Sequence, residues 1–375
     1  MSGPSQTTVP TISFARGAPS TDIVDVEGLK QAAVAAFDED PAGLTAYGTA
    51  VGYLPLRRWI AEKHGVPEEH VLVTNGSMQA DAFLFDELVR PGDAVITERP
   101  TYDRTLLGLK ERGADLHLLT LEEDGLAVDE VAALVDGGVR PTLAHVIPNF
   151  QNPAGYTLSL AKRQRLLELA REHGFVIFED DPYVDVRFTG EPLPRMLELD
   201  GGTESTHVVY ASSFSKTVCP GVRVGYLVGP PQIIDRIRRR ATNTYIAPNM
   251  VAQGIVNQFV RGPRFAAALE TVKTALAERS ATLDEALREH LPQASFRRPE
   301  GGYFLWVSLP EGEGHDVKRI AQEAALRGVG IVPGTDFLLE GGHNAFRLAY
   351  SGVLTEHIDE GVRRLADAVS AARAS

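Results

Sequence analysis

The chain has 375 residues, of which 43% are hydrophobic and 23% charged, a composition typical of a globular protein large enough for more than one domain. Its formal net charge of −13 disfavours nucleic acid or an anionic membrane surface as a partner. The one cysteine, Cys219, excludes an intrachain disulfide and disfavours a cysteine-based metal site. We therefore expect a reducing, cytoplasmic setting, in line with the lack of a secretory signal pattern or an apolar run of membrane-spanning length.

The N-terminal segment, residues 12–19, contains Arg16 beside Gly17. A glycine lets the backbone lie close to a ligand, although a plain turn would use the same residues. Arg16 could meet a substrate acid or only the surface. Residues 26–37 have helical periodicity, and Tyr47 follows them in a glycine-containing stretch. On its own, this tyrosine could equally pack against its own domain.

The next segment pairs an apolar run at residues 71–74, expected to be a strand, with a helix-like stretch at residues 77–89. Gly76 and Ser77 open this helix, and Met78 follows. Free N–H groups in a first helical turn and the positive end of the helix dipole suit a phosphate group. Such turns are also common in proteins that bind no phosphate.

Apolar runs and helix-like stretches then alternate as far as residue 229, which predicts a mainly parallel sheet with helices on its faces. After one such run, the acids Glu179, Asp180 and Asp181 stand in a row. A carboxylate at the end of a buried strand is costly without a partner, and a protonated ring nitrogen is one such partner. A metal ion is the competing interpretation, but no clustered histidine lies nearby in the sequence, so no metal site is predicted.

Lys216 lies in the run S-S-F-S-K-T-V-C-P-G-V-R-V-G at residues 212–225, directly after an apolar stretch. Its amine can form an imine with a carbonyl group. Ser213 suits a phosphate oxygen, and the Arg223 guanidinium suits the same phosphate as a charged fork. A proline and a glycine four and five residues later forbid a long helix, so we expect Lys216 on a loop at a strand end, where open α/β sheets place ligands.

The C-terminal part changes character. A long helical stretch at residues 264–290 leads to short strands and a helix, a pattern that predicts a smaller α+β domain. Arg347 lies inside an apolar strand at residues 344–350, and a buried arginine requires an anionic partner. A substrate carboxylate held by both arms of the guanidinium is one candidate, and an ion pair within the chain is the other.

Taken in order, these motifs resemble those of the fold-type I pyridoxal phosphate (PLP) enzymes, in particular the class I/II aminotransferases of the 2-aminoadipate and aromatic aminotransferase group. The resemblance covers essentially the whole chain. The motifs that carry it are P-x-Y at 100–102, N-x-x-N-P-[TA]-G at 149–155, D-x-x-Y at 180–183, S-x-S-K-x-x-x-P-G-x-R-x-G at 213–225 and F-R-L-x-[FY] at 346–350.

The resemblance implies an α/β fold with two domains. The large PLP-binding domain, residues 46–275, would hold a mainly parallel seven-stranded sheet in an α/β/α sandwich. A smaller α+β domain would comprise residues 276–375, joined by an N-terminal segment, residues 1–45.

The resemblance also assigns roles to single residues. Lys216 would hold PLP as an internal aldimine and act as the catalytic base. The residues that would hold the cofactor phosphate, here called the phosphate cup, are Gly76, Ser77, Met78, Ser213 and Arg223. The residues that would contact the cofactor ring are Tyr102, Asn152, Asp180 and Tyr183. Tyr47 would reach the cofactor phosphate of the other subunit. The substrate would contact Arg16, Gly17, Asn152 and Arg347.

The function implied is amino-group transfer from an L-amino acid to a 2-oxo acid by a ping-pong mechanism, in a homodimer with shared active sites. A PLP-dependent lyase, decarboxylase or oxidase on the same scaffold remains an alternative, as does a non-catalytic PLP-binding module. The motifs do not identify the amino donor, for which Arg16, Tyr303 and residues 242–245 are candidate pocket residues.

Overall fold

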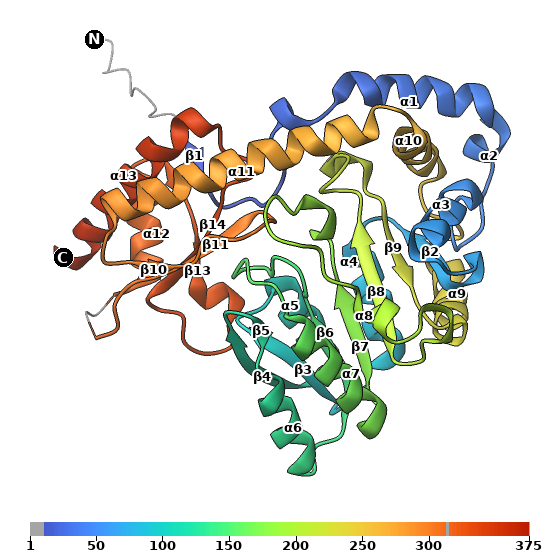
Figure 1. Cartoon of the computed structure of the whole chain (residues 1–375), viewed down its shortest axis with the longest axis horizontal. Coiled ribbons are helices and arrows are strands. Elements are labelled where there is room, and N and C mark those ends of the chain that lie inside the picture. The colour runs from blue at the N-terminus through green and yellow to red at the C-terminus, as the bar shows by residue number, and fades with distance from the viewer. Residues whose placement is uncertain (1–10, 313–314, 375) are drawn as a thin grey trace, which may run out of the picture.

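The computed structural model describes residues 11–312 and 315–374, so residues 1–10 of the predicted N-terminal segment lie outside it (Figure 1). Its larger sheet has eight strands in the order β2-β9-β8-β7-β6-β3-β4-β5. The strands are β2 (Val71–Thr74), β3 (Ala94–Arg99), β4 (Asp115–Glu122), β5 (Gly125–Leu126), β6 (Pro141–Val146), β7 (Val176–Asp180), β8 (Val208–Ser213) and β9 (Gly225–Val228).

The five central strands of this sheet, from β8 to β4, pair in parallel. β9 pairs antiparallel with both β8 and β2, so β2 runs in the same direction as the central strands. The two-residue β5 forms a hairpin with β4. The prediction of a mainly parallel sheet is confirmed, with β5 as a short eighth strand beside the predicted seven.

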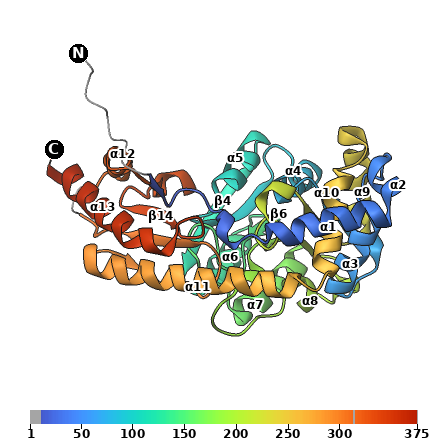
Figure 2. The ribbon, with the colours of Figure 1, turned by 90° about the horizontal axis from the view of Figure 1, so that it is seen from above.

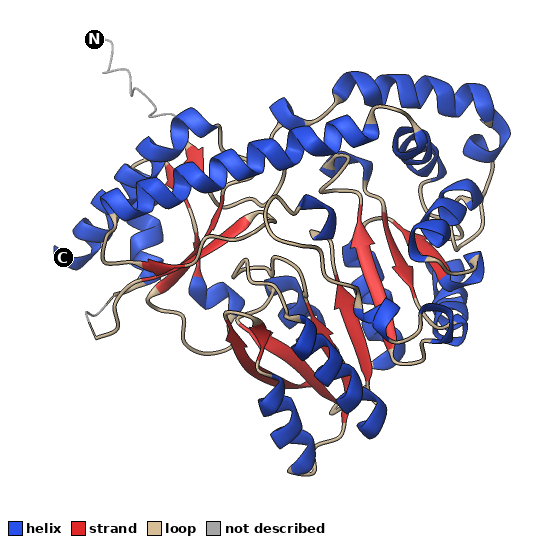
Figure 3. Cartoon of the chain, viewed as in Figure 1, coloured by secondary structure: helices blue, strands red, loops and turns tan. Residues whose placement is uncertain are grey.

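Helices cover both faces of the sheet because its strands are apolar on both sides. In β8, Val208 and Tyr210 pack into one buried cluster and Val209 and Ala211 into another, as the two-residue period of a strand requires. Figure 3 shows the resulting layers of helix, sheet and helix. The first cluster includes side chains of α6 (Val128–Asp136), α7 (Leu160–His173) and α8 (Met196–Leu199), and the second those of α4 (Ser77–Leu88), α5 (Asp103–Glu111) and α9 (Pro231–Tyr245).

The N-terminal helices lie beside this sheet. α1 packs along α10, as seen from above in Figure 2, and Tyr47 lies in the loop that follows α2. The bounds here are α1 (Val26–Glu39), α2 (Pro41–Thr45), α3 (Leu54–His64) and α10 (Met250–Arg261). Short 3-10 helices lie at Thr21–Ile23, Glu68–His70, Val184–Val186, Gly202–Glu204, Pro220–Val222 and Gly334–Phe337.

The second sheet is antiparallel, in the order β10-β11-β14-β13. Its helices include α11, which runs from the large sheet to the small one (Figure 1). The N-terminal strand β1 joins this part by pairing in parallel with β12. The elements are β1 (Ile12–Ser13), α11 (Phe265–His290), β10 (Ser295–Phe296), β11 (Phe304–Ser308), α12 (Val317–Leu326), β12 (Val329–Gly330), β13 (Val332–Pro333), β14 (Ala345–Ala349) and α13 (Thr355–Ala374).

This arrangement confirms the predicted α/β class with a smaller α+β part. The domain limits stay a prediction, and the limit placed at residues 275/276 falls within the continuous helix α11. Among the described residues, none of the helices combines the length and the apolar character needed to cross a membrane.

Candidate active site

Three of the predicted side chains come from neighbouring strands of the large sheet. Asp180 is the last residue of β7, Lys216 lies in the turn after β8, and Asn152 lies in the loop after β6. Because β6, β7 and β8 are adjacent and parallel, their carboxyl ends meet at one edge of the sheet. The expected loop position of Lys216 is confirmed.

Lys216 is enclosed by parts of the chain that are far apart in sequence. Its Nζ donates to the carbonyl oxygen of Gly17 at 2.8 Å and lies 5.4 Å and 5.1 Å from the ring centroids of Tyr183 and Tyr303. Burial, together with the charges of Arg347 and Arg223, lowers the pKa of Lys216 to about 8. A large fraction of this amine is therefore neutral near pH 8, the form that a nucleophile or a base requires.

The Asp180 carboxylate is buried and only partly satisfied. Its Oδ2 lies 3.6 Å from Nε2 of the buried His145, whereas Oδ1 is buried without a hydrogen-bond partner in the described part of the chain. The two neighbouring acids bind protein groups instead: Glu179 accepts from the N–H groups that begin α8, and Asp181 accepts from the Asn149 side chain. Asp180 is thus the acid of the three with an oxygen left for a ligand.

The proposed phosphate cup forms where α4 begins. Gly76 has φ of 88°, and a Cβ atom there would lie 2.2 Å from Nη2 of Arg223, so only glycine lets the guanidinium lie against this backbone. Ser77 and Met78 are the first two residues of α4, where backbone N–H groups have no partner within the helix. Ser213, buried at the end of β8, pairs with Gly225, whose backbone lies against Gly76 and Ser77. The predicted cup residues therefore come together.

Arg347 joins the small sheet to this edge. It is 7% exposed on β14, donates from Nη1 to Asn152 Oδ1 at 2.8 Å and from Nη2 to the Ala15 carbonyl at 2.6 Å. Its guanidinium carbon lies 4.4 Å and 4.8 Å from the ring centroids of Phe304 and Phe337. Both acceptors are uncharged, and Nε is buried without a partner among the described residues. The hydrogen bonds from the two Nη atoms therefore do not neutralise the charge of the guanidinium, which suits an anionic ligand.

The remaining predicted residues divide into two groups. Tyr102 is the residue directly before α5, and it packs against the buried cluster that contains Tyr183. Arg16 is exposed, but its charge contributes to lowering the pKa of Lys216, which places it near the amine. Tyr47, in contrast, is 89% exposed, so the fold of a single chain does not enclose it in the site.

Three residues around the site had no role in the sequence prediction. His145 faces Asp180, and Glu98 bonds to Gln151 beside Asn152. A histidine inside an apolar strand and a glutamate at the end of one were visible signals, because each is unusual in a fully buried position.

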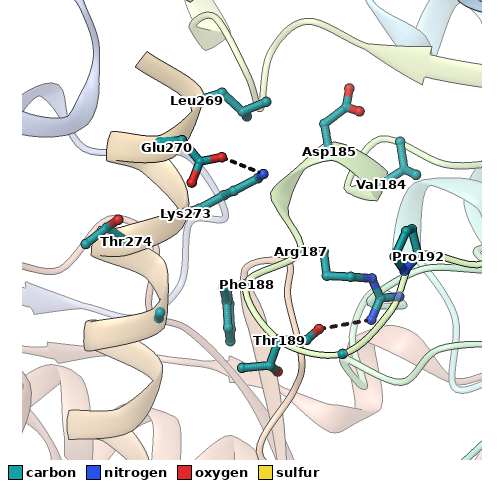
Figure 4. A pocket seen from close by; sticks show the side chains of 12 residues that line it. Val184, Asp185, Arg187, Phe188, Thr189, Pro192, Leu269, Glu270, Lys273 and Thr274 are labelled. Atoms are coloured by element: carbon teal, nitrogen blue, oxygen red, sulfur yellow. Dashed lines mark hydrogen bonds and ion pairs between the residues drawn. The ribbon is translucent and has the colours of Figure 1, made fainter. Parts of the chain in front are cut away.

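A separate cavity of about 630 Å³ lies between the segment after Tyr183 and the helix α11 (Figure 4). Its charged side chains already form ion pairs: Asp185 with Lys63, Arg187 with Glu300, and Lys273 with Glu270. This cavity therefore does not compete with the strand-end edge as the candidate site.

Comparison with known proteins agrees with the fold and the motifs. Residues 10–365 match the family described as "Aminotransferase class I and II". The chain is 32% identical to aromatic-amino-acid aminotransferase 1 of Thermococcus litoralis, over 96% of this chain and 88% of the relative, and 32% identical to the 2-aminoadipate transaminase of Thermus thermophilus, over 96% and 90%.

Among solved structures, the α-aminoadipate aminotransferase of Thermus thermophilus, complexed with N-(5′-phosphopyridoxyl)-L-leucine, superimposes with a TM-score of 0.92 at 31% identity, covering 97% of this chain and 93% of that one. The chain belongs to the aminotransferase class I and II family. The predicted family, fold and enzyme class are confirmed.

Proposed function

We propose that the chain is a PLP-dependent aminotransferase that moves an amino group from an L-amino acid to a 2-oxo acid through Lys216. The observation that carries this proposal is the meeting of three groups at one sheet edge. These groups are the partly buried amine of Lys216, the half-satisfied carboxylate of Asp180 and the Arg347 guanidinium, whose acceptors are neutral.

The residues present fit PLP in their chemistry. Asp180 offers a buried, unpartnered carboxylate oxygen among the described residues, which suits a protonated pyridine nitrogen. Gly76 keeps the start of α4 open beside the Arg223 guanidinium, which suits a phosphate dianion. A carbonyl group would find a nucleophile in Lys216.

By this proposal, Lys216 would hold the cofactor covalently, and Asp180 would hold its ring nitrogen. Asn152 and Tyr183 would face its phenolic oxygen, and Tyr102 would stack on its ring. The phosphate would be held by Gly76, Ser77, Met78, Ser213 and Arg223. When bound, PLP supplies an electron sink that stabilises negative charge at the α-carbon of the substrate.

The chain's own residues would do the remaining work. Arg347 and Asn152 would hold the substrate α-carboxylate, with Nε of Arg347 gaining the partner that it lacks. The backbone of Gly17 would lie along the substrate. The neutral Lys216 amine would then move the α-proton, because its lowered pKa of about 8 lets it act as a base near neutral pH. The Phe304 and Phe337 rings beside Arg347 would exclude water from the carboxylate.

We also propose a homodimer in which the Tyr47 side chain, 89% exposed, reaches the partner's cofactor phosphate. The chain is equally identical to a relative named for aromatic amino acids and to one named for 2-aminoadipate, so both classes of amino donor should be tested. Arg16 and Tyr303 are the candidate residues for donor specificity. The division into residues 1–45, 46–275 and 276–375 and a cytoplasmic location remain parts of the proposal; the single cysteine supports the latter.

The experiment is a panel of aromatic amino acids and 2-aminoadipate as donors, with 2-oxoglutarate and pyruvate as acceptors. We expect product only when an acceptor is present, and Lys216→Ala should lower kcat by more than about 10³-fold and abolish covalent PLP attachment. Lys63→Ala, which removes a partly buried lysine paired with Asp185 at 2.6 Å, is the matched control. Product formed without an acceptor would instead indicate a lyase, decarboxylase or oxidase.

A further inference from the structure

Two buried polar side chains outside the proposed cofactor and substrate contacts bond to each other beside Asn152. Glu98 lies near the end of β3, and Gln151 lies in the loop after β6; each is 1% exposed. Gln151 Nε2 donates to Glu98 Oε2 at 2.9 Å, and the backbone N–H of Ile147 approaches both carboxylate oxygens at 3.4 Å. Most buried polar groups in proteins have a hydrogen-bond partner, and both of these side chains do.

Gln151 uses every polar atom of its amide to fix its own loop. Besides Glu98, Nε2 donates to the carbonyl of Pro100 at 2.9 Å, and Oε1 accepts from the N–H of Ala154 at 2.9 Å. The bond to Ala154 spans Asn152, and the other two bonds tie the loop to the end of β3. The side chain of Gln151 therefore sets the backbone on both sides of Asn152.

The opposite end of the loop is fixed separately. Asn149 donates to both oxygens of Asp181 at 2.9 Å and 3.0 Å and accepts from Arg163 at 2.9 Å. Directly after these two anchoring residues, Asn152 presents its Oδ1 to Arg347 at 2.8 Å. The Asn152 amide has a short side chain, so its reach to Arg347 depends on where the backbone is held.

The Glu98 carboxyl acts in this network mainly as a hydrogen-bonding group. Burial raises the pKa of Glu98 to about 8, although the hydrogen bonds from the N–H groups of Gln151 and Ile147 act to lower it. The negative charge of Asp180 adds to the increase. At neutral pH the neutral form prevails, so a glutamine at position 98 would closely match the native group.

We propose that Glu98 and Gln151 are positioning residues for the Asn152–Arg347 clamp and so set the affinity for the substrate carboxylate. This inference rests on the function proposed above, and it adds two residues that touch neither cofactor nor substrate. They act through the loop that carries Asn152.

The test compares Gln151→Met and Glu98→Met with Glu98→Gln. The two methionine variants remove the hydrogen bonds at similar side-chain length, so we expect the KM for the amino donor to rise about 10-fold and kcat to stay within about threefold. Glu98→Gln should stay within about twofold of the wild type. The dissociation constant of 3-phenylpropanoate, an unreactive carboxylate probe measured by calorimetry, should rise in parallel with KM, while the amount of covalently bound PLP stays constant.

Gln253→Met is the matched control. Gln253 is also 1% exposed and accepts from the backbone N–H of Tyr53 at 2.7 Å, so its loss should lower stability without changing KM. The proposal is overturned if Gln151→Met changes KM and probe affinity no more than Gln253→Met does. If Glu98→Met does not fold, Gln151→Met decides alone. Wild-type protein that transfers no amino group would refute the proposed function, whereas weaker probe binding by Gln151→Met would still support positioning.

Discussion

The cofactor side and the substrate side of the proposed site are built from different parts of the chain. The cofactor side, Gly76, Asp180, Ser213 and Arg223, comes from one sheet and the turns at its edge. The substrate side, Gly17, Asn152 and Arg347, joins that edge to the N-terminal segment and to β14 of the small sheet. Its contacts therefore cross between separately packed cores.

The two sides also differ in how far the chain satisfies its own polar groups. On the cofactor side, Asp180 Oδ1 is buried without a partner among residues 11–312 and 315–374. On the substrate side, both Nη atoms of Arg347 already donate to protein oxygens. A cofactor would mostly add contacts, whereas a substrate carboxylate has to share or displace existing ones. The difference predicts tight cofactor binding and weaker substrate binding, because only the surplus over replaced contacts contributes to affinity.

The largest effect should come from the cofactor side. Asp180→Asn keeps the shape of the side chain but removes the charge that would face a protonated ring nitrogen, so kcat should fall by about 10³-fold. The measurement is kcat at saturating donor, together with the absorbance of the bound cofactor. Asp200→Asn removes another mostly buried carboxylate, bonded to Arg171 and Ser205, and should leave kcat unchanged. A kcat near the wild-type value in Asp180→Asn would contradict the assigned role.

On the substrate side, Arg347→Lys should act on KM. A lysine supplies the charge but not the planar pair of donors, so we expect KM for the donor to rise about 100-fold. Cofactor content should stay unchanged, which separates the two sides. Arg279→Lys is the matched control, since Arg279 is 2% exposed and bonds to Ser20, Asp22 and the Ser351 carbonyl. An equal increase in KM in both variants would show a general packing effect.

The same division explains what the sequence could predict. Cofactor-side residues lie in short contiguous motifs, where a glycine turn, a lysine loop or a row of acids carries chemical meaning within about ten residues. The contacts of the polar network behind them lie in no short motif, because His145 and Asp180 meet only when β6 and β7 pair in register. Likewise, Glu98 and Gln151 are 53 residues apart. Arg347 was predicted from its unusual place in an apolar strand, but its bond to Ala15 was not, since it depends on the N-terminal segment packing against β14.

A third effect concerns Lys216, which lies between the two sides, and it requires no catalysis to detect. Burial and the charges of three arginines, Arg347, Arg223 and Arg16, lower the pKa of Lys216 from 10.5 to about 8 in the folded chain. Between pH 8 and pH 10.5 the unfolded chain binds a proton that the folded chain does not. The destabilisation by this lysine is therefore complete below pH 8 and disappears as the pH rises to 10.5. In cofactor-free protein, Lys216→Met should therefore be more stable than the wild type at pH 7. The difference in unfolding free energy should shrink by about 3 kcal/mol over that range, as measured by urea denaturation.

Lys63→Met provides the opposite sign in the same assay. Burial acts to lower the pKa of Lys63. The interactions of Lys63 with Tyr226 and Asp185 outweigh burial and raise this pKa above 10.5. The stability that this ion pair contributes is present below pH 10.5 and is lost only at higher pH, so the difference between Lys63→Met and the wild type should stay constant from pH 7 to pH 10. If the difference in unfolding free energy from the wild type stayed constant with pH for both lysine variants, the Lys216 amine would titrate normally in the folded chain. Lys216 would then lack the neutral amine that the substrate side requires near pH 8.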